Sequence, residues 1–183
     1  MSHLRVISSR PPGITGDEAC LDAFQQELDY VFRTLRRLGV GPSEIEDLAQ
    51  EVFLALRHSW PEYDAERPLR PYLFGIAFRI ASAHQRKRKR EVMLGVVEVD
   101  DTRPGPDDTL AAKQARVALL AALEKVPLPR RGVLVMHDID GISMAQVASA
   151  LSIPLFTAYS RLRKARRELE VALKRLLRES DGR

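Results

Sequence analysis

The chain has 183 residues, which suits one domain of ordinary size or two small ones, and 45% of them are hydrophobic, as in globular proteins. Its net charge of +4 is unremarkable, and two halves that folded separately would each have a modest core. The single cysteine, Cys20, excludes an intrachain disulfide framework and a multi-cysteine metal cluster, and it fits a reducing, cytoplasmic location.

Both candidate targeting signals are missing from the sequence. It has no run of 18 apolar residues that could cross a membrane. Residues 1–16 lack the apolar segment of a signal peptide, so we expect them to form a disordered tail.

Apolar residues at helical spacing predict one amphipathic helix from Asp17 to Leu38, ended by Gly39. Its expected inward residues are Leu21, Phe24, Leu28, Phe32 and Leu35.

A second helix follows, and Ser43 and Glu46 have the spacing of a capping box at its start. Its apolar face runs from Ile45 to Leu56. The opposite face carries Asp47, Gln50, Glu51 and Leu54. A leucine among acids and amides suggests a surface for a partner protein, although a solvated helix face would also carry acids.

A polar loop over residues 61–70 separates this helix from the next, which is expected from Pro71 into the basic run 84–91. Aromatic residues and arginines alternate around the loop, a combination that can stack on and clamp unpaired bases. The aromatic residues are Trp60, Tyr63, Tyr72, Phe74 and Phe78. Core packing is expected to take about half of them.

The charges are unevenly distributed along the chain. Residues 79–90 and 161–178 are strongly basic, whereas residues 98–108 between them are acidic. Each basic run alone could be a solvated helix face, but two such runs suggest two surfaces for a polyanion. Residues 92–108 also lack a helical period, and we interpret them as an acidic, flexible linker. The linker would join two small helical domains, residues 17–91 and 109–178. Residues 179–183 are expected to form a C-terminal tail.

The second domain contains a predicted helix-turn-helix. A helix is expected from Thr109 to Val126, and a short one over residues 130–139. A capping box at Ser143 and Gln146 begins the next short helix, and a turn over residues 152–154 leads into a long helix from about Leu155 to Arg178. Basic and hydroxyl residues on its first turns suit the DNA major groove, although a plain helical hairpin is the alternative.

Motifs for catalysis and for cofactor or metal binding are missing from the sequence. It has no GxxxxGK[ST], GxGxxG or HExxH motif, and its four histidines are scattered. We therefore expect a non-enzymatic protein without a cofactor.

Three segments of the first domain resemble region 2 of bacterial RNA polymerase sigma factors: IEDLAQEVFLAL at 45–56, YDAERPLRPYLFGIA at 63–77 and HQRKRKRE at 84–91. Residues 123–169 are similar to region 4 of the same proteins. The presence of these two regions, joined by a short linker, resembles the extracytoplasmic-function (ECF) group of the sigma-70 family. The all-α, two-domain organisation agrees with this resemblance.

The resemblance implies an alternative sigma factor that binds core RNA polymerase and directs promoter recognition, melting and initiation in the bacterial cytoplasm, at the nucleoid. It implies core RNA polymerase as a partner, with contacts to the β′ clamp helices and the β flap, and it assigns polymerase binding to Asp47, Gln50, Glu51 and Leu54. For the −10 promoter element it implies Trp60, Glu62, Tyr63, Asp64, Arg67, Arg70, Tyr72, Arg79, Arg86, Lys87 and Arg88. For the −35 element the candidates are Thr157, Tyr159, Ser160, Arg161, Arg163, Lys164 and Arg167. It also implies an anti-sigma protein as partner and a linker that enters the polymerase channel.

Several residues depart from the family pattern. Phe156 occupies a usual glycine position, Tyr159 a usual lysine, and Ser152 a usual glycine of the turn, where a left-handed backbone is needed. Two other functions compete with the sigma factor: an autonomous helix-turn-helix regulator with a helical dimerisation domain, and a helical adaptor that does not bind DNA. The loop over residues 61–70 and the acidic linker favour the sigma factor, because an autonomous regulator needs neither.

Overall fold

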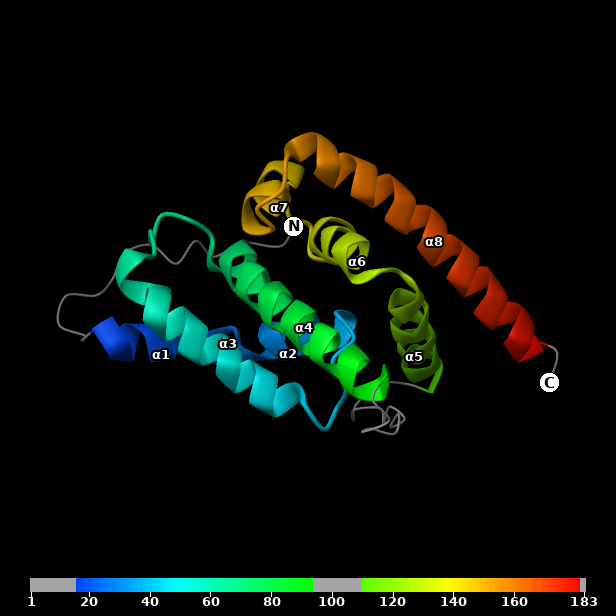
Figure 1. The fold of residues 1–183 in the computed structure, drawn as a ribbon, viewed down its shortest axis with the longest axis horizontal. Coiled ribbons are helices and arrows are strands. Elements are labelled where there is room, and N and C mark those ends of the chain that lie inside the picture. Colours follow the sequence, from blue (N-terminus) through cyan, green and yellow to red (C-terminus); the bar gives the residue numbers. More distant parts are fainter. Residues whose placement is uncertain (1–15, 94–109, 182–183) are drawn as a thin grey trace.

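The computed structural model describes residues 16–93 and 110–181, and all regular elements within these ranges are helical (Figure 1). In chain order they are α1 (Gly16–Gln26), α2 (Leu28–Arg37), α3 (Ile45–Ser59), the 3-10 turn η1 (Trp60–Glu62), α4 (Leu69–Met93), α5 (Leu110–Lys125), α6 (Leu128–Leu134), the π-helical turn η2 (Val135–Ile139), α7 (Met144–Ala150) and α8 (Leu155–Asp181). The all-α prediction is confirmed. The predictions for residues 1–15, 94–109 and 182–183 lie outside the described residues.

Element boundaries differ from the predicted ones in a few places. Helix α4 begins at Leu69 rather than Pro71 and runs through Met93, so it includes the first two residues of the predicted linker. Helix α8 continues to Asp181, three residues into the predicted C-terminal tail. Among the described residues, no helix is long and apolar enough to cross a membrane.

The predicted single helix over residues 17–38 was wrong, because the chain bends at Glu27. The backbone there leaves helical geometry (φ −107°, ψ 8°), and the Glu27 carboxylate forms an ion pair with Arg70 of α4 at 2.8 Å. The bend changes which residues face inward. Leu21 is exposed, whereas Cys20, Tyr30 and Val31, which the helical period did not select, are buried.

The two predicted capping boxes have opposite outcomes. The first was wrong: α3 begins at Ile45 with Glu44 at the N-cap and no side-chain cap bond, and the Glu44 carboxylate instead contacts Nε2 of His84 at 3.0 Å. The second is confirmed at Ser143, whose Oγ accepts from the Gln146 backbone N–H while the Gln146 side chain accepts from the Ser143 backbone N–H.

The turn between α7 and α8 has the expected left-handed residue. Ser152 has a φ of 52°, and the N–H of Ile153 donates to the Ala148 carbonyl at 2.9 Å. A side chain in this backbone region costs roughly 1 kcal/mol or more relative to glycine. The turn therefore keeps the helix-turn-helix geometry although its residue is not glycine.

The N-terminal half (residues 16–93) and the C-terminal half (residues 110–181) share one hydrophobic core. Buried residues of α2, α3 and α4 are continuous with those of α5, α6, α7 and α8. In Figure 1, α5 and α6 lie between α4 and α8. Helix α4 also contacts α7, and α2 contacts α5. Neither half therefore depends only on the modest core that it would have alone.

Arg131 of α6 is the main polar link between the halves. Its side chain is buried (4% exposed), and its guanidinium donates to three backbone carbonyls, those of Leu38, Glu124 and Val126, at 2.7, 2.8 and 3.1 Å. These carbonyls belong to the ends of α2 and α5, where helices leave their last carbonyls without partners. Burial lowers the pKa of Arg131 to about 10, so it stays protonated at neutral pH.

A second polar link is centred on Asp140, at the end of η2. Its carboxylate accepts from the Tyr30 hydroxyl at 2.9 Å and from Nη1 of Arg37 at 2.8 Å. Burial raises the pKa of Asp140, and burial together with the nearby carboxylate raises the pKa of Tyr30.

Two glycines allow the close approach of the halves. A Cβ on Gly75 of α4 would lie 2.6 Å from the Ala150 carbonyl oxygen of α7, and a Cβ on Gly132 of α6 would lie 2.6 Å from the Phe78 ring. Real Cβ atoms are essentially never found at such distances, so a larger residue would displace the α7 backbone at Gly75 and the Phe78 ring at Gly132.

We expect Gly75→Ala to lower the free energy of unfolding by up to about 2 kcal/mol, measured by urea denaturation. Alanine in a helix interior gains about 1 kcal/mol over glycine, but overpacking against a backbone carbonyl costs about 1–3 kcal/mol. Gly41→Ala is the control, because its nearest neighbour is the Glu44 side chain at 3.3 Å. A Gly75→Ala protein at least as stable as the wild type would contradict the packing of α4 on α7.

Candidate nucleic-acid interface

The outer face of α3 carries the four residues predicted to bind the polymerase. Buried residues, among them Leu48, Val52 and Leu56, anchor α3 in the core. Asp47, Gln50, Glu51 and Leu54 project from the opposite side and are all exposed, with Leu54 at 53%. The structure therefore brings these four residues together on one surface, with an apolar side chain among polar ones.

The aromatic residues predicted around the loop form a stack. The ring centroids of Trp60 and Tyr63 are 5.2 Å apart, with planes 19° from parallel, and those of Tyr63 and Tyr72 are 5.0 Å apart. All three side chains are half-buried. Phe74, in contrast, is fully buried, and Phe78 packs against Gly132 of the other half, as expected for aromatics taken by the core.

The loop between η1 and α4 is organised by its own polar contacts. The Tyr63 hydroxyl donates to the Arg67 carbonyl, and the Asp64 carboxylate accepts from the Glu66 backbone N–H at 3.0 Å. Burial raises the pKa of Tyr63, so its hydroxyl stays protonated and can donate at neutral pH. Trp60, Tyr63 and Tyr72 thus lie on a preformed support, which we name the aromatic stack.

The basic residues near the aromatic stack differ in how they are held. Arg70 is fixed by Glu27 and lies over the Tyr30 ring, 5.3 Å from its centroid, so its guanidinium already has partners within the protein. Arg67 forms an ion pair with Asp64 at 3.4 Å. Further along α4, Arg79, Arg86 and Lys87 are exposed, and Arg88 is half-buried. Glu62 is exposed at the end of η1.

Helix α8 presents the residues predicted for the −35 element. Ala158, Leu162 and Ala165 are buried against the rest of the C-terminal half, which α8 contacts through α5, α6 and α7. The exposed side chains of the first four turns include Tyr159, Arg163, Lys164 and Arg167, whereas Thr157, Ser160 and Arg161 are half-buried. The last three, together with Phe156 and Lys164, line a groove between α8 and the start of α6.

Arg166, which was not among the residues predicted to bind DNA, forms an ion pair within the protein. Its guanidinium makes two bonds to the Asp138 carboxylate, at 2.7 and 2.8 Å. The hydrogen bonds from Arg166 lower the pKa of Asp138. The pair joins α8 to η2.

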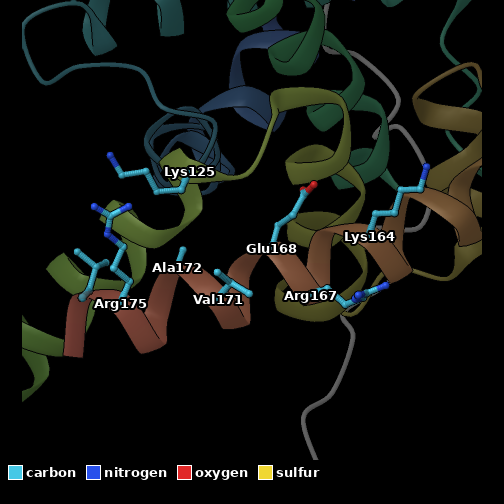
Figure 2. Close-up of a pocket in the computed structure, with 8 residues that line it drawn as sticks. Lys125, Lys164, Arg167, Glu168, Val171, Ala172 and Arg175 are labelled. Atoms are coloured by element: carbon cyan, nitrogen blue, oxygen red, sulfur yellow. The ribbon is translucent and has the colours of Figure 1, made fainter. Parts of the chain in front are cut away.

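A second groove, between the end of α5 and the middle of α8, was missed by the sequence analysis (Figure 2). Val171 lies at its centre and is 68% exposed, and four cations surround it. The cations are Lys125, Lys164, Arg167 and Arg175. The one acid that lines the groove, Glu168, forms an ion pair with Arg130 at 2.7 Å. Only the packing of α5 beside α8 creates this groove, so no local signal predicted it.

The described residues include no group of three or more His, Cys, Asp or Glu side chains that could hold a metal ion. The fold and these surfaces define a helical DNA-binding protein, with a helix-turn-helix in one half and an aromatic and basic surface on the other.

Comparisons with known proteins identify the family. The Sigma-70 region 2 family matches residues 23–91, and the Sigma-70 region 4 family matches residues 116–169. The chain is 29% identical over 173 residues to the ECF RNA polymerase sigma factor SigL of Mycobacterium tuberculosis. The aligned region covers 92% of this chain and 97% of SigL. It is 25% identical over 144 residues to the RNA polymerase sigma factor NccH of Alcaligenes xylosoxydans xylosoxydans, over 75% of this chain and 77% of NccH.

Two solved structures of sigma factors have a fold similar to that of this chain. The sigma factor RpoE in complex with the anti-sigma factor NepR from Bartonella quintana matches with a TM-score of 0.66 and 26% identity, over 84% of this chain and 98% of that one. CnrH in complex with the cytosolic domain of CnrY has a similar fold, with a TM-score of 0.63 and 22% identity, over 85% of this chain and 88% of CnrH.

The chain belongs to the ECF group of the sigma-70 family. It is an alternative sigma factor, the subunit that binds core RNA polymerase and directs promoter recognition and transcription initiation. These findings favour the sigma factor over an autonomous helix-turn-helix regulator.

We expect Arg166→Met to raise the pKa of Asp138 back toward its ordinary value near 3.8, measured by NMR titration of the carboxyl group. Because the folded-state pKa of Asp138 is lowered, the pair stabilises the fold above pH 3.8 and loses this contribution as the pH falls through the lowered pKa. The contribution is at most about 1 kcal/mol, because Arg166 is exposed. Arg163→Met is the control and leaves the Asp138 titration unchanged, whereas an unshifted pKa in Arg166→Met would contradict the pair.

Proposed function

We propose that the N-terminal half contacts core polymerase and the −10 element, and that the C-terminal half contacts the −35 element. The observation that carries this division is that three surfaces lie on different helices: the outer face of α3, the aromatic stack with the basic end of α4, and the first turns of α8. The protein acts without an enzymatic activity of its own, in the bacterial cytoplasm at the nucleoid.

The outer face of α3 is proposed to dock on the β′ clamp helices of the polymerase. Asp47, Gln50 and Glu51 supply acceptors and one amide donor, and the exposed Leu54 supplies apolar contact area. A single exposed leucine is normal on a protein surface, so the support for docking is that Leu54 lies among three hydrogen-bonding side chains on one continuous face.

The aromatic stack is proposed to hold a base that has left the −10 duplex. Extruding a base costs a few kcal/mol, and stacking on an aromatic side chain returns roughly 1–3 kcal/mol per base. The preformed order of the loop reduces the conformational entropy lost on binding. Arg79, Arg86, Lys87 and Arg88 are placed along α4 to contact nearby phosphates.

Arg67 and Arg70 are proposed to act with the loop rather than independently. Each already has a carboxylate partner in the structure, Asp64 and Glu27 respectively. DNA phosphates would have to compete with these carboxylates for the two guanidinium groups, and Asp64 and Glu62 remain candidates for contacts to base donors.

The groove around Val171 is proposed as the contact site for the polymerase β flap. Its apolar centre and basic rim suit an amphipathic helix that carries acids. An anti-sigma protein is a further proposed partner, since the RpoE and CnrH structures were solved with NepR and CnrY respectively.

We expect the Asp47→Ala and Gln50→Ala double variant to bind core polymerase at least tenfold more weakly while keeping the wild-type helical content. The measurement is co-purification of the tagged protein with bacterial core polymerase, challenged with the housekeeping sigma factor. Asp29→Ala is the control, because Asp29 is an exposed carboxylate on α2 and does not belong to the outer face of α3. Normal binding by the double variant would contradict the docking role of this face.

We expect Tyr63→Ala to weaken holoenzyme binding to a promoter fragment with a pre-opened −10 region by about 5- to 150-fold, which corresponds to the loss of one stacked base. Tyr63→Phe keeps the ring and loses only the hydroxyl contact to Arg67, so it should stay within a few-fold of the wild type. Equal affinity of the alanine and phenylalanine variants would show that the stack does not hold a base.

A further inference from the structure

Phe156 is an exposed aromatic residue that the fold does not use. It is the second residue of α8, and 85% of its side chain is exposed. Full burial of a phenylalanine side chain stabilises a folded protein by about 1.5–3 kcal/mol. Because Phe156 is exposed, it contributes little of this free energy to folding. Aromatic residues are enriched in intermolecular contacts, so Phe156 is a candidate for such a contact.

The position of Phe156 on α8 places it in the middle of the face that points away from the protein. Phe156, Ser160, Arg163 and Arg167 are spaced by four, three and four residues, so they form one stripe along the helix. Ala158, Leu162 and Ala165, which are buried, form the stripe on the opposite side. Phe156 is therefore the first residue of the stripe that would enter the major groove, where the N-terminal residues of a recognition helix contact base edges.

A phenyl ring can read only one feature of the major groove. It has no hydrogen-bond donor or acceptor, so it cannot recognise the polar edges of guanine, cytosine or adenine. The C5 methyl group of thymine is the one apolar group displayed there, and phenylalanine is among the side chains that contact it.

The surroundings of Phe156 favour DNA over a protein as the binding partner. The groove beside it is also lined by Pro129, Arg130, Thr157, Ser160, Arg161 and Lys164. These residues provide three cations and two hydroxyl groups, and no acid lines the groove. Arg130 is already paired with Glu168, whereas Arg161 and Lys164 form no ion pair with any residue that the structure describes. This combination suits phosphates on either side of a base contact.

We propose that Phe156 is a specificity-determining residue, which selects thymine in the −35 element through contact with its C5 methyl group. The inference rests on the proposed role of α8 as the helix that reads this element. The remainder of the stripe, Ser160, Arg163 and Arg167, then makes the polar contacts to neighbouring bases and phosphates.

The test compares DNA with and without the methyl group. A promoter is first found by run-off transcription of genomic fragments with the wild-type holoenzyme, and its −35 element is then randomised. The library is prepared twice, once with thymine and once with deoxyuridine, which lacks only the methyl group. Holoenzymes carrying wild-type protein, Phe156→Ala or Leu155→Ala select from both libraries, and the bound DNA is sequenced. Leu155 is the matched control, because it is an exposed apolar neighbour (47%) that lies off the stripe.

The wild type and Leu155→Ala are expected to prefer thymine at one or two positions by about three- to fivefold per methyl group, and to lose this preference in the deoxyuridine library. Phe156→Ala is expected to show no such preference in either library while keeping the preferences at other positions. A methyl-dependent preference that survives in Phe156→Ala, or a wild type indifferent to the methyl group, would overturn the proposal.

Two other outcomes would show which assumption is wrong if the expected result is not obtained. If the wild type shows no base preference anywhere in the randomised element, the role of α8 itself is wrong, and the proposal for Phe156 falls with it. If Phe156→Ala loses binding to core polymerase while its base preferences are unchanged, Phe156 contacts a protein instead of thymine.

Discussion

The arrangement of the whole chain depends on one buried guanidinium. Arg131 satisfies carbonyls at the ends of two helices from different halves, α2 and α5, so each half supplies part of its hydrogen bonding. A positive charge is favourable at both places because the carbonyl end of a helix carries partial negative charge. Gly39 is required beside it for two reasons: its φ is 90°, and a Cβ at this position would collide with the guanidinium.

Other contacts between the halves act together with this link. Asp140 accepts from both Tyr30 and Arg37 of α2, and α4 approaches α7 closely at Gly75. The shared core uses the inner faces of α3, α4 and α8. The outer faces of the same helices therefore stay accessible, and these are the faces on which the polymerase and promoter contacts are proposed.

Sequence periodicity predicted the buried and exposed faces most accurately where a helix is regular and has one buried side. The apolar face and the outer face of α3 agree with the structure because an uninterrupted helix keeps the same residues inward along its length. The same reasoning failed at Glu27, where an ion pair with distant Arg70 accompanies a bend, and at Ser43, where Glu44 is taken by His84. Both errors involve partners about 40 residues away along the chain, which local patterns do not contain.

The sequence by itself determined the all-α class, the helix-turn-helix, the two basic runs and the resemblance to sigma regions 2 and 4, because these depend on residue spacing within single helices and short turns. Only the tertiary structure decided that the halves share a core, that Arg70 and Arg166 already have partners, that a groove forms around Val171, and that Phe156 stays exposed. Each of these features depends on which helices lie side by side, and that depends on the buried contacts at Arg131, Asp140 and Gly75 acting together.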